Sequence, residues 1–381
     1  MSFCICKKIL FFLTIFILFL VLQLRPESKS DSFRGLWITR DNLVSKEKID
    51  GVINTAFEKG FNNLVIQVRG RGDAYYKSRI VPIAEEIKNS IEVFDPLQYF
   101  IEEAHKKNIK VHCWFNVFLL WSSPREPESK NHLYFKKPQW FCIPHNLLDN
   151  GAENFQTPAD IIYISPGIDE VQNYLLKVIE EVVDNYSVDG VHLDYVRYPG
   201  ENFGYNEILR NKFLLLNKID PIELIRNQEY VMKKIGEKAF YNLVQEWNNF
   251  RGEQINIFVQ NIKGIVKQRD SSTILSAAVV PDLNRAKSVF YQFWSDWVNR
   301  KFVDFVMPMN YVISSDDFKN NIIKMLEYVP KERIIMGFSA VNQSKYKLAS
   351  KVFLTKSMGI EKFCIFSYDS IKYSNDIIDL F

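Results

Sequence analysis

Short apolar segments alternate along the chain with longer segments whose apolar residues recur every three or four positions. Eight of the short segments have the length and composition of β-strands, and helical segments separate most of them. The predicted strands are 33–40, 63–69, 110–116, 191–195, 274–280, 302–311, 333–339 and 362–368. Strand and helix in alternation, eight times over, predict an α/β fold, the (β/α)8 TIM barrel. A doubly wound open sheet is the alternative, although no glycine-rich dinucleotide fingerprint follows the first strand.

Two long connections interrupt this regular pattern. The first follows the third strand, spans 117–167 and contains Trp121 and Trp140, so we expect it to form the wall of a cleft. The second follows the fourth strand, covers 206–268 and is mostly helical in pattern, which predicts a helical insertion. A length of 381 residues fits one such barrel, so we predict a single domain over 31–381 after a separate segment over 1–30.

The N-terminal segment has the pattern of a secretory signal. Lys7 and Lys8 precede an apolar run over 9–22 in which Thr14 is the one polar residue. The run is a little short for a membrane span, which needs about 20 residues. We therefore expect either a cleaved signal peptide or an N-terminal anchor. Because the two lysines favour the inner side of a membrane, the rest of the chain would be secreted, periplasmic or membrane-anchored outside the cytoplasm. Membrane contact would occur only through this segment, if it stays uncleaved.

Composition narrows the classes of function. A net charge of +3 is too small to indicate binding to nucleic acid. The five histidines and five cysteines form no metal-binding motif, so we expect no metal and no cofactor, with His112 and His192 on neighbouring strands as the alternative. Cys113 and Cys364 lie in apolar strands, which predicts buried thiols. A serine hydrolase would need a Gly-x-Ser-x-Gly elbow, and the chain has none.

The most informative segment is VDGVHLDYVRYP, at 188–199. Side chains alternate along a strand, so His192 and Asp194 share one face while their apolar neighbours share the other. Buried strands of a parallel sheet are usually apolar throughout, which makes this pair unusual. In (β/α)8 barrels the working residues lie at the C-terminal ends of strands, where Asp194 falls. Asp189 precedes the strand and has the position of a structural turn residue.

Asp194 is therefore the first candidate for catalysis. Hydrolysis of a glycosidic bond needs two carboxyl groups, one to protonate the leaving oxygen and one to act as nucleophile or base. The candidate partners, which follow other predicted strands, are Asp369, Asp282 and Asp73. An aspartate in such a loop also often caps the next helix. The structural alternative for Asp194 is an ion pair with Arg197 or Arg69.

Other residues near the strand ends, or in the loops that follow, would bind the substrate, which we expect to be a polysaccharide. Their amides, guanidinium groups, carboxylates and hydroxyls can bond to sugar hydroxyls, and their rings can stack on sugar faces. The predicted substrate-binding residues are Arg69, Asp73, Tyr75, Trp114, Asn116, Trp121, His192, Tyr195, Arg197, Tyr198, Asn310 and Tyr311.

Six segments together carry a specific resemblance. They are FRGLWITR, NLVIQVRGRGDAYYKS, KVHCWFN, VDGVHLDYVRYP, FVDFVMPMNY and FCIFSYD, and they extend over nearly all of 33–368. The series resembles the glycosyl-hydrolase-like family placed near glycoside hydrolase family ten. This resemblance implies a TIM barrel, export to the envelope and hydrolysis of glycan chains, which in some members are peptidoglycan strands stripped of stem peptides. It also places Asp194 at the family's catalytic position on strand four.

The same segment is also similar to the strand-four motif of family eighteen chitinases. That pattern ends in an acidic glutamate two positions beyond its last aspartate, where this chain has Val196. Met309 and Tyr311 likewise resemble the Met-x-Tyr of chitinase strand six. The missing glutamate argues against chitinase chemistry and leaves two main hypotheses, beside a third in which the protein hydrolyses some other polar polymer. The first is an exported glycoside hydrolase with Asp194 as general acid or nucleophile, and the second is a glycan-binding barrel without catalysis.

Overall fold

The computed structural model describes residues 32–150, 161–341 and 343–372. Contacts within the chain divide it into two units, Met1–Phe33 and Arg34–Phe381. All of the elements given below belong to the second unit. The predicted signal or anchor over 1–30 lies outside the described residues. Among the helices that are described, none is both long enough and apolar enough to span a membrane.

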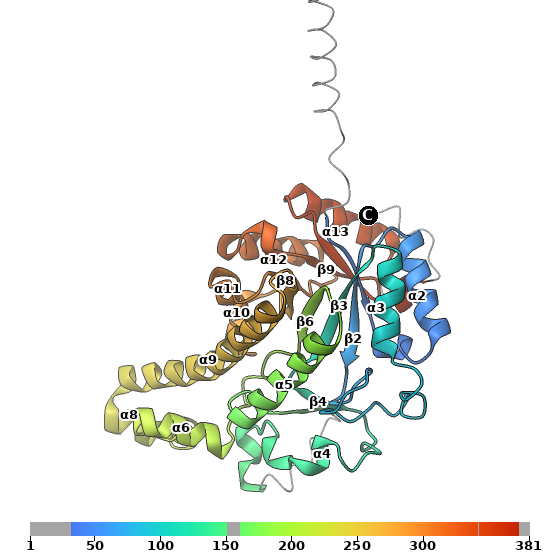
Figure 1. The fold of residues 1–381 in the computed structure, drawn as a ribbon. Helices are drawn as coiled ribbons and strands as arrows, with labels where there is room; N and C mark the ends of the chain where they lie inside the picture. Colours follow the sequence, from blue (N-terminus) through green and yellow to red (C-terminus); the bar gives the residue numbers. More distant parts are fainter. Residues whose placement is uncertain (1–31, 151–160, 342, 373–381) are drawn as a thin grey trace, which may run out of the picture. The chain divides into compact units, whose positions relative to one another are not determined.

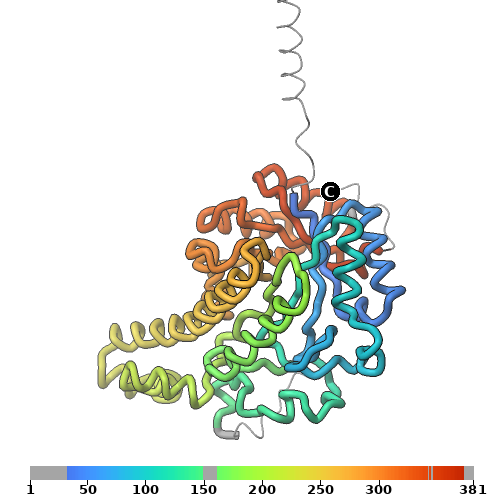
Figure 2. The backbone as a smooth tube through the Cα atoms, in the orientation of Figure 1, coloured from blue at the N-terminus to red at the C-terminus, as the bar shows by residue number. Residues whose placement is uncertain are grey.

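Eight parallel strands form the centre of the fold. They are β1 (Arg34–Ile38), β2 (Asn63–Arg69), β3 (Lys110–Asn116), β6 (Gly190–Asp194), β7 (Ile274–Val279), β8 (Phe305–Pro308), β9 (Met336–Ser339) and β10 (Phe363–Phe366). Their order in the sheet is β8-β7-β6-β3-β2-β1-β10-β9. β1 and β10, the first and last of these strands along the chain, therefore lie side by side (Figure 2). Bridges from Val306 to Ile334 and from Met309 to Gly337 bring the edge strands β8 and β9 together. The predicted (β/α)8 TIM barrel is confirmed.

Helices connect the strands and surround the barrel (Figure 1). They are α2 (Lys46–Glu58), α3 (Pro96–Lys106), α5 (Asp169–Asn185), α10 (Leu283–Ser288), α11 (Trp294–Asn299), α12 (Ser315–Tyr328), α13 (Lys345–Ser357) and α14 (Tyr368–Ile371), with 3-10 turns η1 (Arg40–Asn42) and η5 (Lys331–Arg333). Local capping sets several helix starts. The Ser45 side chain accepts a 3.4 Å hydrogen bond from the backbone N–H of Lys48 at α2, and the Asp95 carboxylate accepts one of 3.1 Å from Leu97 at α3.

The connection after β3 contains short elements of its own. They are β4 (Leu119–Ser122), α4 (Leu133–Lys136), η2 (Pro138–Trp140), η3 (His145–Asn150) and β5 (Ile161–Tyr163). β4 and β5 pair antiparallel, and the backbone N–H of Ile164 donates to the carbonyl of Phe118 at 2.9 Å. This pairing ties the two ends of the connection to each other and lets both contribute to the mouth of the barrel.

The helical insertion after β6 is confirmed. Its helices are α6 (Glu207–Asn217), α7 (Glu223–Arg226), α8 (Gln228–Ile235) and α9 (Glu237–Arg269). The 33-residue α9 takes part in two apolar cores. Ile262 packs in the main core, whereas Phe240 packs with Leu224 and Val231 in a small core of the insertion itself. One long helix therefore links the insertion to the barrel, as Figure 1 shows.

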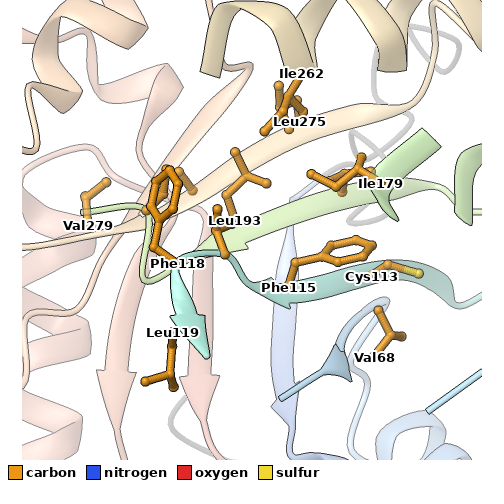
Figure 3. Close-up of a cluster of buried hydrophobic side chains, with 14 of the residues drawn as sticks. Val68, Cys113, Phe115, Phe118, Leu119, Ile179, Leu193, Ile262, Leu275 and Val279 are labelled. Carbon is orange, nitrogen blue, oxygen red and sulfur yellow. The ribbon is translucent and has the colours of Figure 1, made fainter. Parts of the chain in front are cut away.

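The outward faces of the strands pack against the helices. Figure 3 shows part of this layer, with Phe115 of β3 and Leu193 of β6 in the same cluster as Ile262 of α9. Full burial of such a side chain stabilises the fold by about 1.5–3 kcal/mol. Cys113 belongs to this cluster, and Cys364 is also buried and free, which confirms the prediction of buried thiols.

The inward faces of the strands fill the barrel with polar as well as apolar side chains. Gly190 of β6 lies beside His112 of β3, and a Cβ atom at position 190 would stand 2.0 Å from Nδ1 of that histidine. Nε2 of His112 lies 2.8 Å from Oδ1 of Asn63 on β2. Glycine is therefore required at position 190 because the imidazole occupies the space of a side chain.

Candidate functional site

A cavity of about 420 Å³ lies at the C-terminal mouth of the barrel. Residues from several strand ends and from both β4 and β5 line it. The aromatic lining residues are Trp37, Trp114, Tyr163, Tyr195, Tyr311 and Phe366, and the polar ones are Thr39, Arg40, Asp41, Gln67, Asn116, Ser122 and Asp194. Rings beside hydrogen-bonding groups suit a ligand with apolar faces and polar edges, which describes a sugar chain.

Asp194 is the last residue of β6 and lies in this cavity, as its position at the strand end predicts. The residue is 7% exposed, and its Oδ1 accepts a 2.6 Å hydrogen bond from the backbone N–H of Tyr195. Burial raises the pKa of Asp194, although the Arg197 guanidinium, the Tyr195 N–H and the Trp114 indole each act to lower it. A carboxyl that keeps its proton above the usual range is suited to proton donation.

Tyr195 forms the wall next to this carboxyl. Its φ of 51° lies in the left-handed region, which turns the chain sharply at the end of β6. The ring contacts Tyr163 of β5 edge-on, with centroids 6.0 Å apart, and the Arg197 guanidinium lies 5.1 Å from its centroid. Arg197 is not among the residues that line the cavity. In this structure it supports Tyr195 and lowers the pKa of Asp194.

A chain of hydrogen-bonding groups crosses another part of the lining. Nη1 of Arg40 donates to Oε1 of Gln67 at 3.3 Å, and Nε2 of Gln67 donates to Oδ1 of Asn116 at 3.3 Å. Nδ2 of Asn116 then donates to the carbonyl of Gly70 at 2.9 Å. These contacts fix the two amides in one orientation, so that the cavity presents a prearranged set of donors and acceptors.

His192 lies inside the barrel, completely buried, and is not part of the cavity lining. Its Nε2 accepts a 3.3 Å hydrogen bond from the indole of Trp37, and its Nδ1 lies 2.9 Å from Oγ of Ser276. Burial, with a smaller effect of His112, lowers the pKa of His192 to about 3. The residue is therefore a neutral support for Trp37, which does line the cavity.

Arg69, at the end of β2, is also completely buried and outside the lining. Its Nη1 donates to the carbonyls of Asn116, Val117 at 3.1 Å and Leu119 at 3.4 Å. Burial lowers the pKa of this guanidinium. Arg69 thus fastens the chain that leaves β3, including the two lining residues Asn116 and Leu119.

The candidate partner carboxylates do not line the cavity with Asp194. Oδ2 of Asp369 accepts hydrogen bonds from Thr39 at 3.1 Å and Asn42 at 3.0 Å, and Oδ1 accepts one of 3.0 Å from Lys372. Burial by itself raises the pKa of Asp369, but these hydrogen bonds outweigh it and lower the pKa.

Asp282 caps α10, with Oδ1 3.0 Å from the N–H of Arg285. The Oδ1 atom of Asp73 accepts a 2.7 Å bond from the backbone N–H of Arg71.

Of the predicted substrate-binding residues, Trp114, Asn116, Tyr195 and Tyr311 line the cavity with Asp194. Tyr75, Trp121, Asn310 and Tyr198 are buried outside its lining. The first three donate side-chain hydrogen bonds to other residues of the described chain. The hydroxyl of Tyr75 donates to Glu86 at 2.9 Å, the indole of Trp121 to the carbonyl of Arg125 at 2.8 Å, and the amide of Asn310 to the carbonyl of Phe318 at 3.1 Å, while the ring of Tyr198 packs edge-on against Tyr291.

Several lining residues were not predicted from the sequence. Asp41 follows the first strand closely, so the rule that selected Asp194 would also select it. Gln67 and Phe366 share the inward parity of β2 and β10, which is a weaker signal. Tyr163 belongs to the β4–β5 pair, and nothing in its local sequence predicts that it approaches the barrel. Within the described ranges, no cluster of three or more His, Cys, Asp or Glu side chains could hold a metal ion.

Comparison with known proteins agrees with this geometry. The barrel has an aromatic cavity with an acidic residue at the end of its fourth strand, and such a cavity suits a sugar ligand. The model of the family described as "Glycosyl hydrolase-like 10" matches residues 32–334, and the chain belongs to this family. The resemblance found in the sequence is thereby confirmed.

Two curated relatives carry related names. Over 239 residues the chain is 28% identical to "Glycosyl hydrolase YngK" of Bacillus subtilis, which covers 61% of this chain and 40% of the relative. Over 159 residues it is 32% identical to "Glycosyl hydrolase DigH" of Escherichia coli K12, which covers 40% of this chain and 35% of the relative. The chain thus matches less than half the length of each of these relatives.

Solved structures show the same fold at low sequence identity. The PgaB (BpsB) glycoside hydrolase domain from Bordetella bronchiseptica superposes with a TM-score of 0.66 and 12% identity, covering 92% of this chain and 98% of that one. A β-galactosidase from the psychrophilic Marinomonas ef1 gives 0.60 and 10%, covering 88% and 54%. At these identities the comparison concerns the fold alone.

Proposed function

We propose that the protein hydrolyses glycosidic bonds in polysaccharide chains, with Asp194 as the general acid. The observation that carries the proposal is the position of this one carboxyl. It is buried, its pKa is raised by burial, and it lies in an aromatic cavity at the C-terminal mouth of the barrel. In a (β/α)8 barrel that is where catalytic groups lie.

The surrounding residues support this role. The rings of Trp37, Trp114 and Tyr311 line the cavity together with the polar groups of Arg40 and Asn116, so a bound sugar would meet both apolar and hydrogen-bonding groups. The proton of Asp194 would pass to the glycosidic oxygen as the bond from that oxygen to the anomeric carbon breaks. The raised pKa keeps this proton in place at a pH at which an exposed aspartic acid is ionised.

We further propose that the protein acts outside the cytoplasm on glycan strands of peptidoglycan that lack stem peptides. Export is supported by Lys7 and Lys8 before the apolar run at 9–22. The substrate is supported by the motif resemblance described above, which extends over nearly all of 33–368.

The test is a digestion of defined glycans, with peptide-free peptidoglycan among them, by the full chain and its variants, followed by mass analysis of the products. Asp194→Asn should lower turnover by about 10²–10⁴-fold, the usual contribution of a general acid, while the variant still folds. Asp189→Asn is the matched control. This residue precedes β6, where its carboxylate contacts His105 and the N–H of Val111, each at 2.8 Å, so turnover should persist. Equal rates for wild type and Asp194→Asn would overturn the proposal.

A glycan-binding barrel without catalysis is the second candidate. It is favoured by one observation, which is that Val196 stands where the chitinase-like pattern has its acid. Such a protein would bind the same glycans and release no products. Binding measured by calorimetry, together with the product analysis, separates the two candidates.

A further inference from the structure

We propose that Asp41 is the second carboxylate of the site and acts as the general base, an inference that rests on the proposed function. Among the described residues, Asp41 and Asp194 are the two acidic side chains that line the cavity. Asp41 lies in the η1 turn directly after β1, and Asp194 ends β6. In the order of strands, β2 and β3 stand between β1 and β6. The two carboxylates therefore approach the cavity from separate parts of its rim.

The hydrogen bonds of the other aspartates strengthen this assignment. Asp369, Asp282 and Asp73 each use a carboxylate oxygen to hold a backbone or side-chain donor. In the described part of the chain, no hydrogen bond or ion pair engages the carboxylate of Asp41, and the residue is exposed. A base must accept a proton from water, so it needs an oxygen that is free and accessible to solvent.

Hydrogen bonds fix the backbone around Asp41, although no described residue bonds to its carboxylate. The N–H of Leu43 donates to the carbonyl of Arg40 at 2.9 Å, and Nζ of Lys48 donates to the carbonyl of Asp41 at 2.9 Å. The amide of Asn42 donates to Asp369 at 3.0 Å. Asp369 is thus a positioning residue that holds the turn carrying the base, which gives this predicted catalytic residue an indirect role.

The two carboxyls differ in the way that hydrolysis requires. Asp194 is buried with a raised pKa, and Asp41 is open to water. In the proposed step, Asp41 takes a proton from a water molecule whose oxygen bonds to the anomeric carbon. The bond from that carbon to the glycosidic oxygen breaks, and this oxygen receives the proton of Asp194. One water is consumed, Asp41 ends protonated, and Asp194 ends ionised. Attack by water in a single displacement inverts the anomeric configuration.

The experiment compares the full-length wild type with Asp41→Asn, Asp41→Ala, Asp194→Asn and the control Asp189→Asn on the glycan that the wild type cleaves. We expect both Asp41 variants to lose at least about 10²-fold in kcat with unchanged thermal unfolding, because the side chain is exposed. Sodium azide should restore bond cleavage to Asp41→Ala by forming a glycosyl azide, and it should leave Asp194→Asn inactive. Proton NMR of the first product of the wild type should show inverted configuration.

The outcomes distinguish the two proposals. An active wild type with an inactive Asp194→Asn and a fully active Asp41→Asn would overturn the role of Asp41 alone. A first product of retained configuration would also overturn its role as a base. If the wild type releases no product from any glycan, the proposed function fails, and the role of Asp41 fails with it.

Discussion

The indole Nε1 of Trp37 donates a 3.3 Å hydrogen bond to Nε2 of His192, which joins a ring of the cavity to a buried residue of the barrel interior. Because Nε2 accepts this bond, Nδ1 must carry the proton, and it lies 2.9 Å from Oγ of Ser276. His192 can fulfil both contacts only in its neutral form. Its lowered pKa, about 3, agrees with that state.

We predict that His192 does not titrate in the folded protein between pH 5 and 8. Its pKa is depressed, so its contribution to stability is present above the unfolded value of 6.5 and is lost as the pH falls toward about 3. Each unit of difference is worth about 1.4 kcal/mol. His192→Gln should flatten part of the fall in unfolding free energy below pH 6.5, measured by urea unfolding. A chemical shift of the His192 ring that changes near pH 6.5 would contradict the prediction.

The pKa of Asp194 is raised, whereas that of His192 is lowered, so the two residues give stability opposite dependences on pH. Because its pKa is raised in the fold, its stabilising effect is complete below its ordinary value of 3.8 and is lost as the pH rises through the raised pKa. Asparagine keeps the neutral state at every pH. We expect Asp194→Asn to unfold roughly 2 °C or more above wild type at pH 7 and to lose this advantage near pH 3, measured by calorimetry. An equal difference at both pH values would contradict the raised pKa.

Two glycines offer a matched pair of substitutions. Gly190→Ala would place a Cβ atom 2.0 Å from Nδ1 of His112 inside the barrel, so we expect a loss of about 1–3 kcal/mol or more in unfolding free energy. Gly264 lies exposed within α9, where an added Cβ would meet no atom within 4 Å. Gly264→Ala should therefore stabilise the protein by about 0.5–1 kcal/mol. Chemical unfolding of both variants checks the prediction, and tolerance of alanine at 190 would contradict the packing of His112.

Substitution of Arg69 tests whether this predicted substrate-binding residue stabilises the fold instead of contacting the substrate. Its guanidinium holds the carbonyls of Asn116, Val117 and Leu119, and it is completely buried. Arg69→Met should cost about 2–4 kcal/mol in unfolding free energy without any ligand, because three buried carbonyls lose their donor. Arg71→Met is the control, since Arg71 is partly exposed and its 3.2 Å ion pair with Glu86 is worth about 1 kcal/mol or less. An Arg69→Met variant as stable as wild type, with weakened glycan binding, would favour direct contact with substrate.

Much of the fold follows from local sequence patterns. The alternation of strands and helices predicts the barrel, because apolar periodicity reports which face of each element is buried. The same reasoning places Asp194 correctly at the C-terminal end of β6 and in the cavity, since strand parity and strand direction are both fixed by the chain. Serine and aspartate residues at helix starts are equally local signals.

The environment of each polar side chain is not local. His192 shares the inward parity of Asp194, yet its partners are Trp37 on β1 and Ser276 on β7. Asp369 binds the β1 turn, far away in sequence, and Arg69 binds the chain that leaves β3. These three predicted site residues therefore lie outside the lining of the cavity and bond to other parts of the chain.

The sequence by itself therefore determined the barrel and the strand end where Asp194 lies, because both depend on periodicity along the chain. The tertiary structure decided which other side chains share the cavity. Within the described residues, no hydrogen bond or ion pair engages the Asp41 carboxylate, whereas Asp369, Asp282 and Asp73 are engaged. Tyr163 reaches the cavity through the pairing of β5 with β4. The set of side chains that line the cavity depends on how loops from different strands meet in space, and no single segment of the sequence encodes that arrangement.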